Sequence, residues 1–209
     1  RVADCMLIQD KYVEAISAYR EFIRTRPSHP EIPYAEYKIA EAYVKQIPDD
    51  WLLSPPAHQR DQGPTRRALQ QLRHYIMEYP SHDRVPNAKK LARRALALLA
   101  RHEMYVAEFY LDRDQPKAAI GRLQVVLNAY QGSGVEPKAA LLLGQTYLKL
   151  RDHTSAYNTF QDLAKRYPKT EEALQARSYL KEIGTPAVKA EPTKSPAQQG
   201  LSADPVPNL

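Results

Sequence analysis

Few residues of this chain combine the types and the spacing that catalysis or metal binding requires. His102 and Glu103 begin a run typical of zinc-protease helices, but such a helix needs a second histidine at the position of Val106. The six histidines are scattered, and none has metal-ligand spacing with the single cysteine. Phosphate loops, dinucleotide fingerprints and nucleophile elbows are also missing from the sequence. We therefore expect a protein that is not an enzyme and that uses no metal and no cofactor.

The charge of the chain narrows the class of partner only in part. Its 209 residues include 30 Lys and Arg against 24 Asp and Glu, a formal net charge of +6. This excess permits an acidic partner, a nucleic acid or an anionic membrane surface. The densest basic cluster comprises Lys89, Lys90, Arg93 and Arg94, and the other basic residues are scattered. A solvated surface is the simpler interpretation, so we expect no nucleic-acid partner.

Two further features exclude whole classes of protein. No run of apolar residues is long enough to form a transmembrane helix. The single cysteine, Cys5, excludes a disulfide framework. Cys5 also lacks the preceding small and apolar residues of a lipid-attachment site, so we expect it to be a small buried residue.

A fixed spacing of residues recurs along the chain, which reads with helical periodicity from residue 2 to residue 183. Each of four units has an alanine, a bulky residue four positions later, and a proline or glutamine eight positions after that. These sets are Ala15, Tyr19 and Pro27; Ala68, Leu72 and Pro80; Ala119, Leu123 and Gln131; and Ala156, Phe160 and Pro168. Alanine lets two helices approach closely, and proline ends a helix. The spacing therefore predicts the second helix of a repeated helix pair.

The first helix of each pair has its own pattern, a bulky aliphatic residue, a small residue, and a tyrosine three positions later. Its copies are Ile39, Ala40 and Tyr43; Val106, Ala107 and Tyr110; and Leu143, Gly144 and Tyr147. Together the two patterns have the spacing of tetratricopeptide repeats. We predict an all-α fold, a right-handed α-solenoid of tetratricopeptide helix pairs over residues 1–184, with about four repeats and a capping helix at 171–183. Residues 185–209 are rich in proline and lack aromatic residues, so we expect a disordered tail.

Two insertions interrupt the period. The first, after Tyr43, adds 16 residues and contains several prolines together with Trp51, which predicts a long loop. The second, after Pro80, adds 14 residues rich in Ala, Leu, Lys and Arg, which predicts one long helix from about Asn87 to Leu111.

The candidate binding surface is the concave face that first helices line in such a solenoid. On the helix around Ile39, the residues outside the packing pattern are Tyr34, Tyr37, Glu41 and Lys45. Exposed tyrosines in a groove favour an extended peptide as ligand. The alternative is that Tyr34 and Tyr37 pack against neighbouring helices.

Several segments carry a resemblance to a known family. They are Arg60-Asp61-Gln62-Gly63-Pro64, Tyr79-Pro80-Ser81, and the run Leu-Ala-x-x-Glu-x-x-Val-Ala-x-x-Tyr from Leu99 to Tyr110. Over about residues 1–183 the chain resembles the family of the outer-membrane β-barrel assembly lipoprotein BamD. The long loop and the long helix are features of the same family.

The resemblance implies a scaffold of the β-barrel assembly complex at the periplasmic face of the outer membrane of a Gram-negative bacterium. It implies five repeats and a lipid-anchored N-terminal cysteine as the only link to the membrane; this chain would lack the first repeat and the anchor. The implied partners are the periplasmic domains of BamA, other assembly lipoproteins and unfolded barrel proteins. Arg122 would contact BamA within residues 118–164, or would be an ordinary solvated helix residue. The alternative function is a generic periplasmic adaptor for pilus, division or cell-wall machinery.

Overall fold

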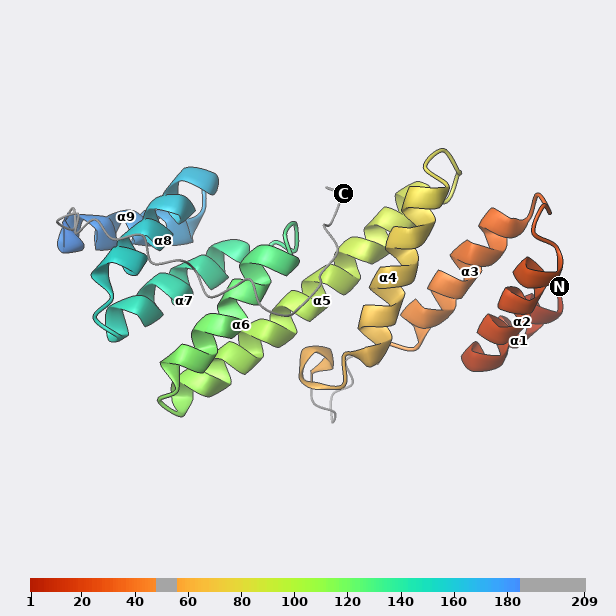
Figure 1. Ribbon diagram of the computed structural model, residues 1–209, viewed down its shortest axis with the longest axis horizontal. Helices are drawn as coiled ribbons and strands as arrows, with labels where there is room; N and C mark the ends of the chain where they lie inside the picture. Colours follow the sequence, from red (N-terminus) through yellow and green to blue (C-terminus); the bar gives the residue numbers. More distant parts are fainter. Residues whose placement is uncertain (48–55, 185–209) are drawn as a thin grey trace.

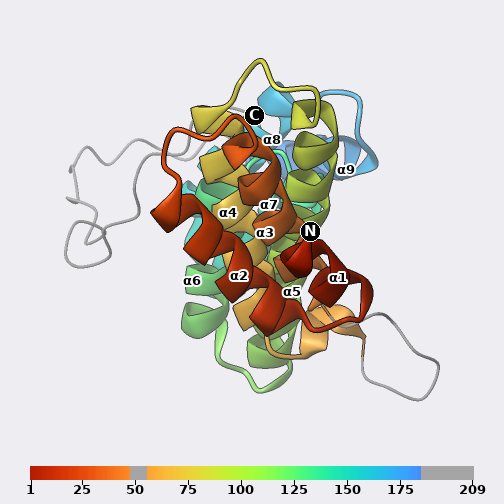
Figure 2. The same ribbon diagram turned by 90° about the vertical axis from the view of Figure 1, so that its right-hand side faces the viewer.

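The computed structural model describes residues 1–47 and 56–184, and within these ranges every regular element is a helix. The elements are α1 (Val2–Ile8), α2 (Tyr12–Thr25), α3 (Ile32–Lys45), the 3₁₀ turn η1 (Ala57–Gln59), α4 (Gly63–Glu78), α5 (Val85–Asp112), α6 (Pro116–Ala129), α7 (Glu136–Lys149), α8 (His153–Arg166) and α9 (Glu171–Ile183). Figure 1 shows them following one another along an elongated body, with α1 and α2 at one end and α8 and α9 at the other. Viewed from the N-terminal end in Figure 2, the helices stack behind one another.

Each helix packs mainly against the helices before and after it in the chain. This neighbour-to-neighbour packing is the arrangement of a repeat solenoid. The alanines of the second-helix pattern, Ala15, Ala68, Ala119 and Ala156, are all fully buried. Of the tyrosines after these helices, Tyr79, Tyr130 and Tyr167 stand at the ends of α4, α6 and α8. The predicted all-α solenoid of tetratricopeptide helix pairs is therefore confirmed.

Helices α7 and α8 approach each other closely at Gly144 of α7. A Cβ atom placed there would lie 2.6 Å from Cζ of Phe160 on α8. The Phe160 ring is fully buried and stacks on Tyr179 of α9, with the ring centroids 4.8 Å apart. This position of the first-helix pattern thus requires a small residue, because a neighbouring ring fills the space that a side chain would occupy.

The long helix α5 joins the two halves of the solenoid. It extends over 28 residues, about 42 Å at 1.5 Å per residue, and confirms the helix expected near 87–111. Its N-terminal half, with Ala88 and Leu96, shares a core with α3 and α4. Its C-terminal half, with Ala100 and Ala107, shares a core with α6 and α7. Tyr130 at the end of α6 packs against both cores.

The last helix, α9, has the bounds that the sequence predicted. The hydroxyl Oγ1 of Thr170 accepts a hydrogen bond from the backbone N–H of Ala173 at 3.3 Å, which caps its N-terminus. Gly184 follows its last residue with a φ of 64°, a left-handed conformation that glycine adopts without strain. The expected loop around Trp51 and the expected tail at 185–209 lie outside the described residues.

The expectation for Cys5 is wrong, because its side chain is exposed. The short helix α1 buries Ala3 and Leu7 against its neighbours and leaves its other side uncovered, so Ile8 is 81% exposed. None of the helices in the described ranges combines the length and the apolar character of a membrane span. No group of three potential metal ligands occurs among the same residues.

Candidate partner-binding surfaces

Arg122, the residue expected to contact a partner, lies on α6 and reaches a carboxylate of α5. Its Nη1 donates a hydrogen bond to Oε2 of Glu103 at 3.1 Å. The Glu103 side chain is only 6% exposed, whereas the Arg122 side chain is 45% exposed. A guanidinium has five N–H donors, and the others of Arg122 have no hydrogen-bond partner among the described residues. The ion pair thus holds a half-exposed guanidinium in place at the surface.

Two basic side chains of α4 lie near Tyr130, which is also close enough to Glu103 to be affected by its charge. Arg66 and Arg73 lie beside Tyr130, whose pKa is raised by burial and by the negative charge of Glu103. The Nε of Arg73 is buried without a hydrogen-bond partner, and burial lowers the pKa of this guanidinium. The surroundings of Tyr130 therefore hold two arginines of α4 and the Glu103 carboxylate, which is already paired with Arg122.

Tyr37 is not a groove residue, which corrects one of the four candidates on α3. Its side chain is 2% exposed and meets Tyr75 of α4 edge to face, with the ring centroids 5.6 Å apart. Its hydroxyl accepts a hydrogen bond from the Asn87 amide of α5. The reason is that α3 packs between α2 and α4 and also touches α5, so that more than one of its faces is covered. The alternative of packing against neighbouring helices therefore holds for Tyr37.

Tyr34 is partly buried in a small polar network at the N-terminal end. Its hydroxyl and that of Tyr19 each donate a hydrogen bond of 2.6 Å to Oδ1 of Asp4. Burial by itself raises the pKa of Asp4, but the hydrogen bonds from Tyr19, Tyr34 and the α-ammonium group of Arg1, together with the charge of that ammonium group, outweigh it, and the pKa lies below its usual value. Burial and the hydrogen bond to Asp4 raise the pKa of Tyr34 to about 12. The Arg84 guanidinium lies 5.1 Å from the Tyr34 ring centroid and 5.2 Å from that of Tyr37, within range of cation–π attraction.

The other two candidates on α3 differ from each other. Glu41 is partly buried and forms an ion pair with Lys38 at 2.6 Å. Lys45 is exposed and has no ion-pair partner among the described residues. The structure thus brings Tyr34 and Glu41 to one side of α3 together with Lys38, and leaves Lys45 as the accessible residue at the C-terminal end.

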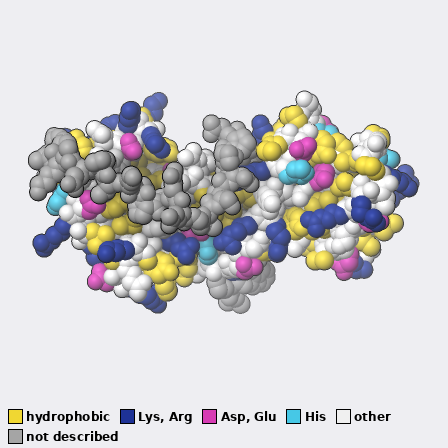
Figure 3. Space-filling model, viewed as in Figure 1, with side chains coloured by type: hydrophobic (Ala, Val, Ile, Leu, Met, Phe, Trp, Pro, Cys, Tyr) yellow, Lys and Arg dark blue, Asp and Glu magenta, His cyan; other side chains and the backbone are white. Residues whose placement is uncertain are grey.

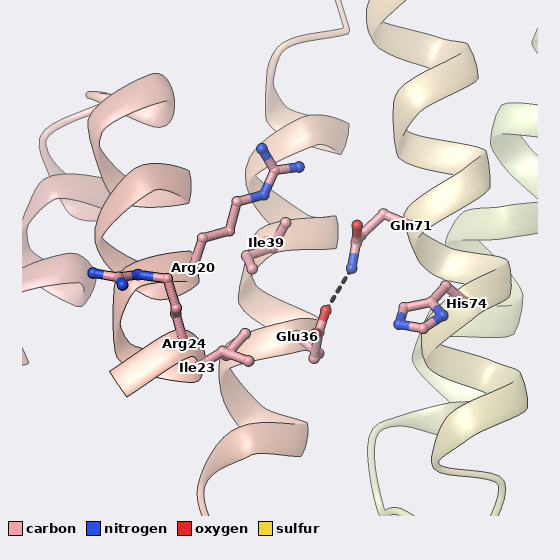
Figure 4. A pocket seen from close by; sticks show the side chains of 7 residues that line it. All are labelled: Arg20, Ile23, Arg24, Glu36, Ile39, Gln71 and His74. Atoms are coloured by element: carbon pink, nitrogen blue, oxygen red, sulfur yellow. Dashed lines mark hydrogen bonds between the residues drawn. The ribbon is translucent and has the colours of Figure 1, made fainter. Parts of the chain in front are cut away.

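A pocket that the sequence did not indicate lies on the opposite side of α3. It has a volume of about 240 Å³ and is lined by Arg20, Ile23, Arg24, Glu36, Ile39, Gln71 and His74, from helices α2, α3 and α4. Figure 4 shows the two isoleucines between the arginines and the α4 side chains, with Gln71 donating a hydrogen bond to Glu36 at 2.6 Å. Around the helix axis, Glu36 and Ile39 lie about 100–160° from Tyr34 and Lys38. The side chains come from three helices, so no local pattern could reveal the pocket.

Comparison with known proteins gives the family. A family described as an outer membrane lipoprotein, YfiO, matches residues 2–152, and a tetratricopeptide repeat family matches residues 138–170. The chain belongs to the YfiO outer membrane lipoprotein family.

It is similar to three proteins named outer membrane protein assembly factor BamD. The one from Caulobacter vibrioides is 31% identical over 191 residues, which cover 91% of this chain and 59% of that protein. The one from Xylella fastidiosa is 30% identical over 165 residues, which cover 76% of this chain and 55% of that protein. The one from Neisseria meningitidis is 27% identical over 165 residues, with 77% and 61% covered.

Membership of the family has two consequences. It places the protein at the periplasmic face of the outer membrane of a Gram-negative bacterium, in agreement with the expectation from the sequence. The relatives are named assembly factors and not enzymes, which agrees with the expectation of a scaffold without catalytic chemistry. The chain spans less than two thirds of the length of these relatives.

Proposed function

We propose that this protein is a scaffold of the outer-membrane β-barrel assembly complex. In this role it holds the periplasmic part of BamA and binds unfolded barrel proteins at a separate surface. The family and the names of its relatives support this class of function. The observation that supports a specific contact is the half-exposed Arg122 anchored on the buried Glu103.

The proposed BamA contact uses the free donors of Arg122. Because Glu103 fixes the side chain, little conformational entropy is lost when a partner binds to it. An arginine with free N–H groups binds a carboxylate through two parallel hydrogen bonds, which a lysine cannot do. We therefore assign an acidic residue of BamA as the group that Arg122 binds, within the surface of residues 118–164.

The test is a binding measurement with the purified periplasmic domains of BamA from the same organism. Arg122→Lys keeps a positive charge near Glu103 but loses the paired hydrogen bonds, and should weaken binding about tenfold. The matched control is Arg166→Lys on α8, an exposed arginine without an ion-pair partner among the described residues. Equal affinities for the wild type and Arg122→Lys would contradict the assigned contact. Failure of the wild type to bind BamA at all would favour the generic periplasmic adaptor.

The proposed substrate surface is the pocket between α2 and α4. Ile23 and Ile39 offer an apolar lining for one side chain of an extended peptide, and Arg20, Arg24 and His74 stand around it. Tyr34 and Glu41 on the other side of α3 already have partners within the chain, so they are less available. We therefore place substrate binding at this pocket in preference to the Tyr34–Lys45 side.

Two matched tryptophan substitutions separate the two sides of α3. His74 and Lys45 are both exposed, and a tryptophan at position 74 would cover the pocket while one at position 45 would cover the other side. Binding of a labelled peptide from the C-terminus of a barrel protein should weaken for His74→Trp and remain unchanged for Lys45→Trp. Weaker binding by Lys45→Trp, with His74→Trp unchanged, would instead assign substrate binding to the Tyr34–Lys45 side.

A further inference from the structure

The N-terminal half of α5 carries positive charge that no acidic residue balances. Residues 84–102 include six Lys or Arg and no Asp or Glu. Four of these cations, Lys90, Arg93, Arg94 and Arg101, are exposed and form no ion pair with any described residue. The nearest acidic residue along the chain in the C-terminal direction is Glu103, which is buried and already paired with Arg122. We call these four residues the α5 cationic stripe.

The four residues occupy one side of the helix. Their offsets of three, four and eleven positions from Lys90 place them on a single face, because an α-helix has 3.6 residues per turn. The residues between them that pack inward, including Ala92, Leu96 and Leu99, are buried. The stripe is about 17 Å long from Lys90 to Arg101 at 1.5 Å per residue. Figure 3 shows the same imbalance over the visible face of the molecule, where Lys and Arg side chains outnumber Asp and Glu.

Without a bound anion, this arrangement of like charges is unfavourable. Lys90 and Arg93 are three positions apart and Lys90 and Arg94 are four apart, the separations at which like charges on a helix repel each other. Some exposed cations elsewhere on the solenoid do have acidic partners, as Lys138 has in Glu108 at 3.1 Å and Lys149 in Asp114 at 2.8 Å. An anionic ligand along the stripe would remove the repulsion between its cations.

We propose that the α5 cationic stripe is the docking surface for an acidic, extended segment of a partner protein. The surface is one helix wide, and an extended chain of five or six residues covers its length at about 3.3 Å per residue. Alternate residues of such a chain point to the same side about 7 Å apart, close to the rise of about 6 Å between Lys90 and Arg94. Acidic residues at alternate positions therefore match the first turn of the stripe, from Lys90 to Arg94.

Two other occupants fit the observations less well. A bilayer surface would need exposed apolar side chains level with the cations, and no large hydrophobic residue between Lys90 and Arg101 is exposed. Residues 185–209 of this chain have two lysines, one glutamate and one aspartate, so they offer no excess of negative charge. The proposal does not rest on the BamA contact, because Glu103 lies about 200° around the helix from Arg101.

The test uses the full chain and a labelled twelve-residue peptide of alternating Glu and Ser, with binding followed by fluorescence anisotropy at low salt. The triple variant Lys90→Gln/Arg94→Gln/Arg101→Gln should weaken binding at least about tenfold. The matched control Lys165→Gln/Arg166→Gln/Lys169→Gln removes three exposed cations from another part of the solenoid and should weaken it less than about twofold. The peptide with Gln in place of Glu should not bind.

A second measurement guards against an effect on folding. The Glu-Ser peptide should raise the Tm of the wild type and of the control variant, and leave that of the stripe variant unchanged. Equal weakening of both triple variants would show that only net charge matters and would overturn the proposal. So would binding of the protein to vesicles that contain phosphatidylglycerol without any binding of the peptide.

Discussion

Arg122 of α6 and Glu103 of α5 form an ion pair of 3.1 Å in which the carboxylate is buried and the guanidinium reaches the surface. The same arginine therefore stabilises the contact between two helices and remains available to a partner. A test of the proposed BamA contact with Arg122 variants therefore has to measure stability and binding separately.

The ion pair makes a prediction for stability. Arg122→Ala leaves the Glu103 carboxylate buried without its partner and should lower the free energy of unfolding by about 2 kcal/mol, a value reduced from that of fully buried pairs because Arg122 is half-exposed. Arg122→Gln/Glu103→Gln removes both charges and should cost less than Arg122→Ala. Urea unfolding measures both. A double variant less stable than Arg122→Ala would show that the attraction within the ion pair exceeds the free-energy cost of burying its charges.

Two glycine substitutions should have opposite effects. Gly144→Ala forces a Cβ into the space of the Phe160 ring, which Tyr179 holds from the other side, and should destabilise the protein by about 1–3 kcal/mol. Gly121→Ala on α6 meets no atom within 4 Å and should stabilise it by about 0.5–1 kcal/mol, because alanine is the better helix former. Thermal unfolding of the two variants provides the comparison. A neutral Gly144→Ala would mean that α7 and α8 can move apart.

The corrected position of Tyr37 is also testable. Tyr37→Ala removes a buried ring between α3 and α4 and should destabilise the protein by about 3–5 kcal/mol. Tyr37→Phe keeps the ring but loses the hydrogen bond from Asn87, and should cost about 1 kcal/mol. The matched surface variant Lys45→Ala should change stability by less than about 0.5 kcal/mol. A small effect of Tyr37→Ala in urea unfolding would indicate that the Tyr37 side chain is exposed and not buried.

The Asp4 network predicts a dependence on pH. Because the pKa of Asp4 is lowered in the folded protein, its stabilising contribution is complete above the ordinary value of 3.8 and disappears as the pH falls through the lowered pKa. Asp4→Asn should therefore cost about 1 kcal/mol at pH 7 and progressively less below about pH 4. Unfolding free energies of wild type and variant across this range measure the effect.

The control for this prediction is Asp162→Asn, an exposed aspartate of α8 without a hydrogen-bond or ion-pair partner among the described residues. It should leave stability unchanged at pH 7. A cost of Asp4→Asn that stays constant down to pH 3 would indicate a packing effect and not a charge effect.

Most of the helices and their order could be predicted from the sequence. The spacing of Ala15, Ala68, Ala119 and Ala156 identified the repeats, and the gap before Ala107 identified the long helix α5. These predictions succeeded because each helix pair packs mainly against its neighbours, so that the same local pattern recurs in each unit. The bounds of α9 agree with the helix predicted at 171–183, and the structure caps its two ends with Thr170 and Gly184, which directly flank the helix in the sequence.

The candidate binding surfaces depend on contacts between helices, and the sequence alone does not show which side chains meet there. Whether Tyr37 or Tyr34 faces a neighbour is decided by how α2, α4 and α5 surround α3, and Cys5 is exposed because α1 has a covered and an uncovered side. The pairing of Arg122 with Glu103 joins residues 19 positions apart on different helices. The sequence by itself determined the repeats and the family resemblance, since both lie in local spacing. Only the tertiary structure decided which side chains remain free to bind, because burial and charge pairing arise where separate helices meet.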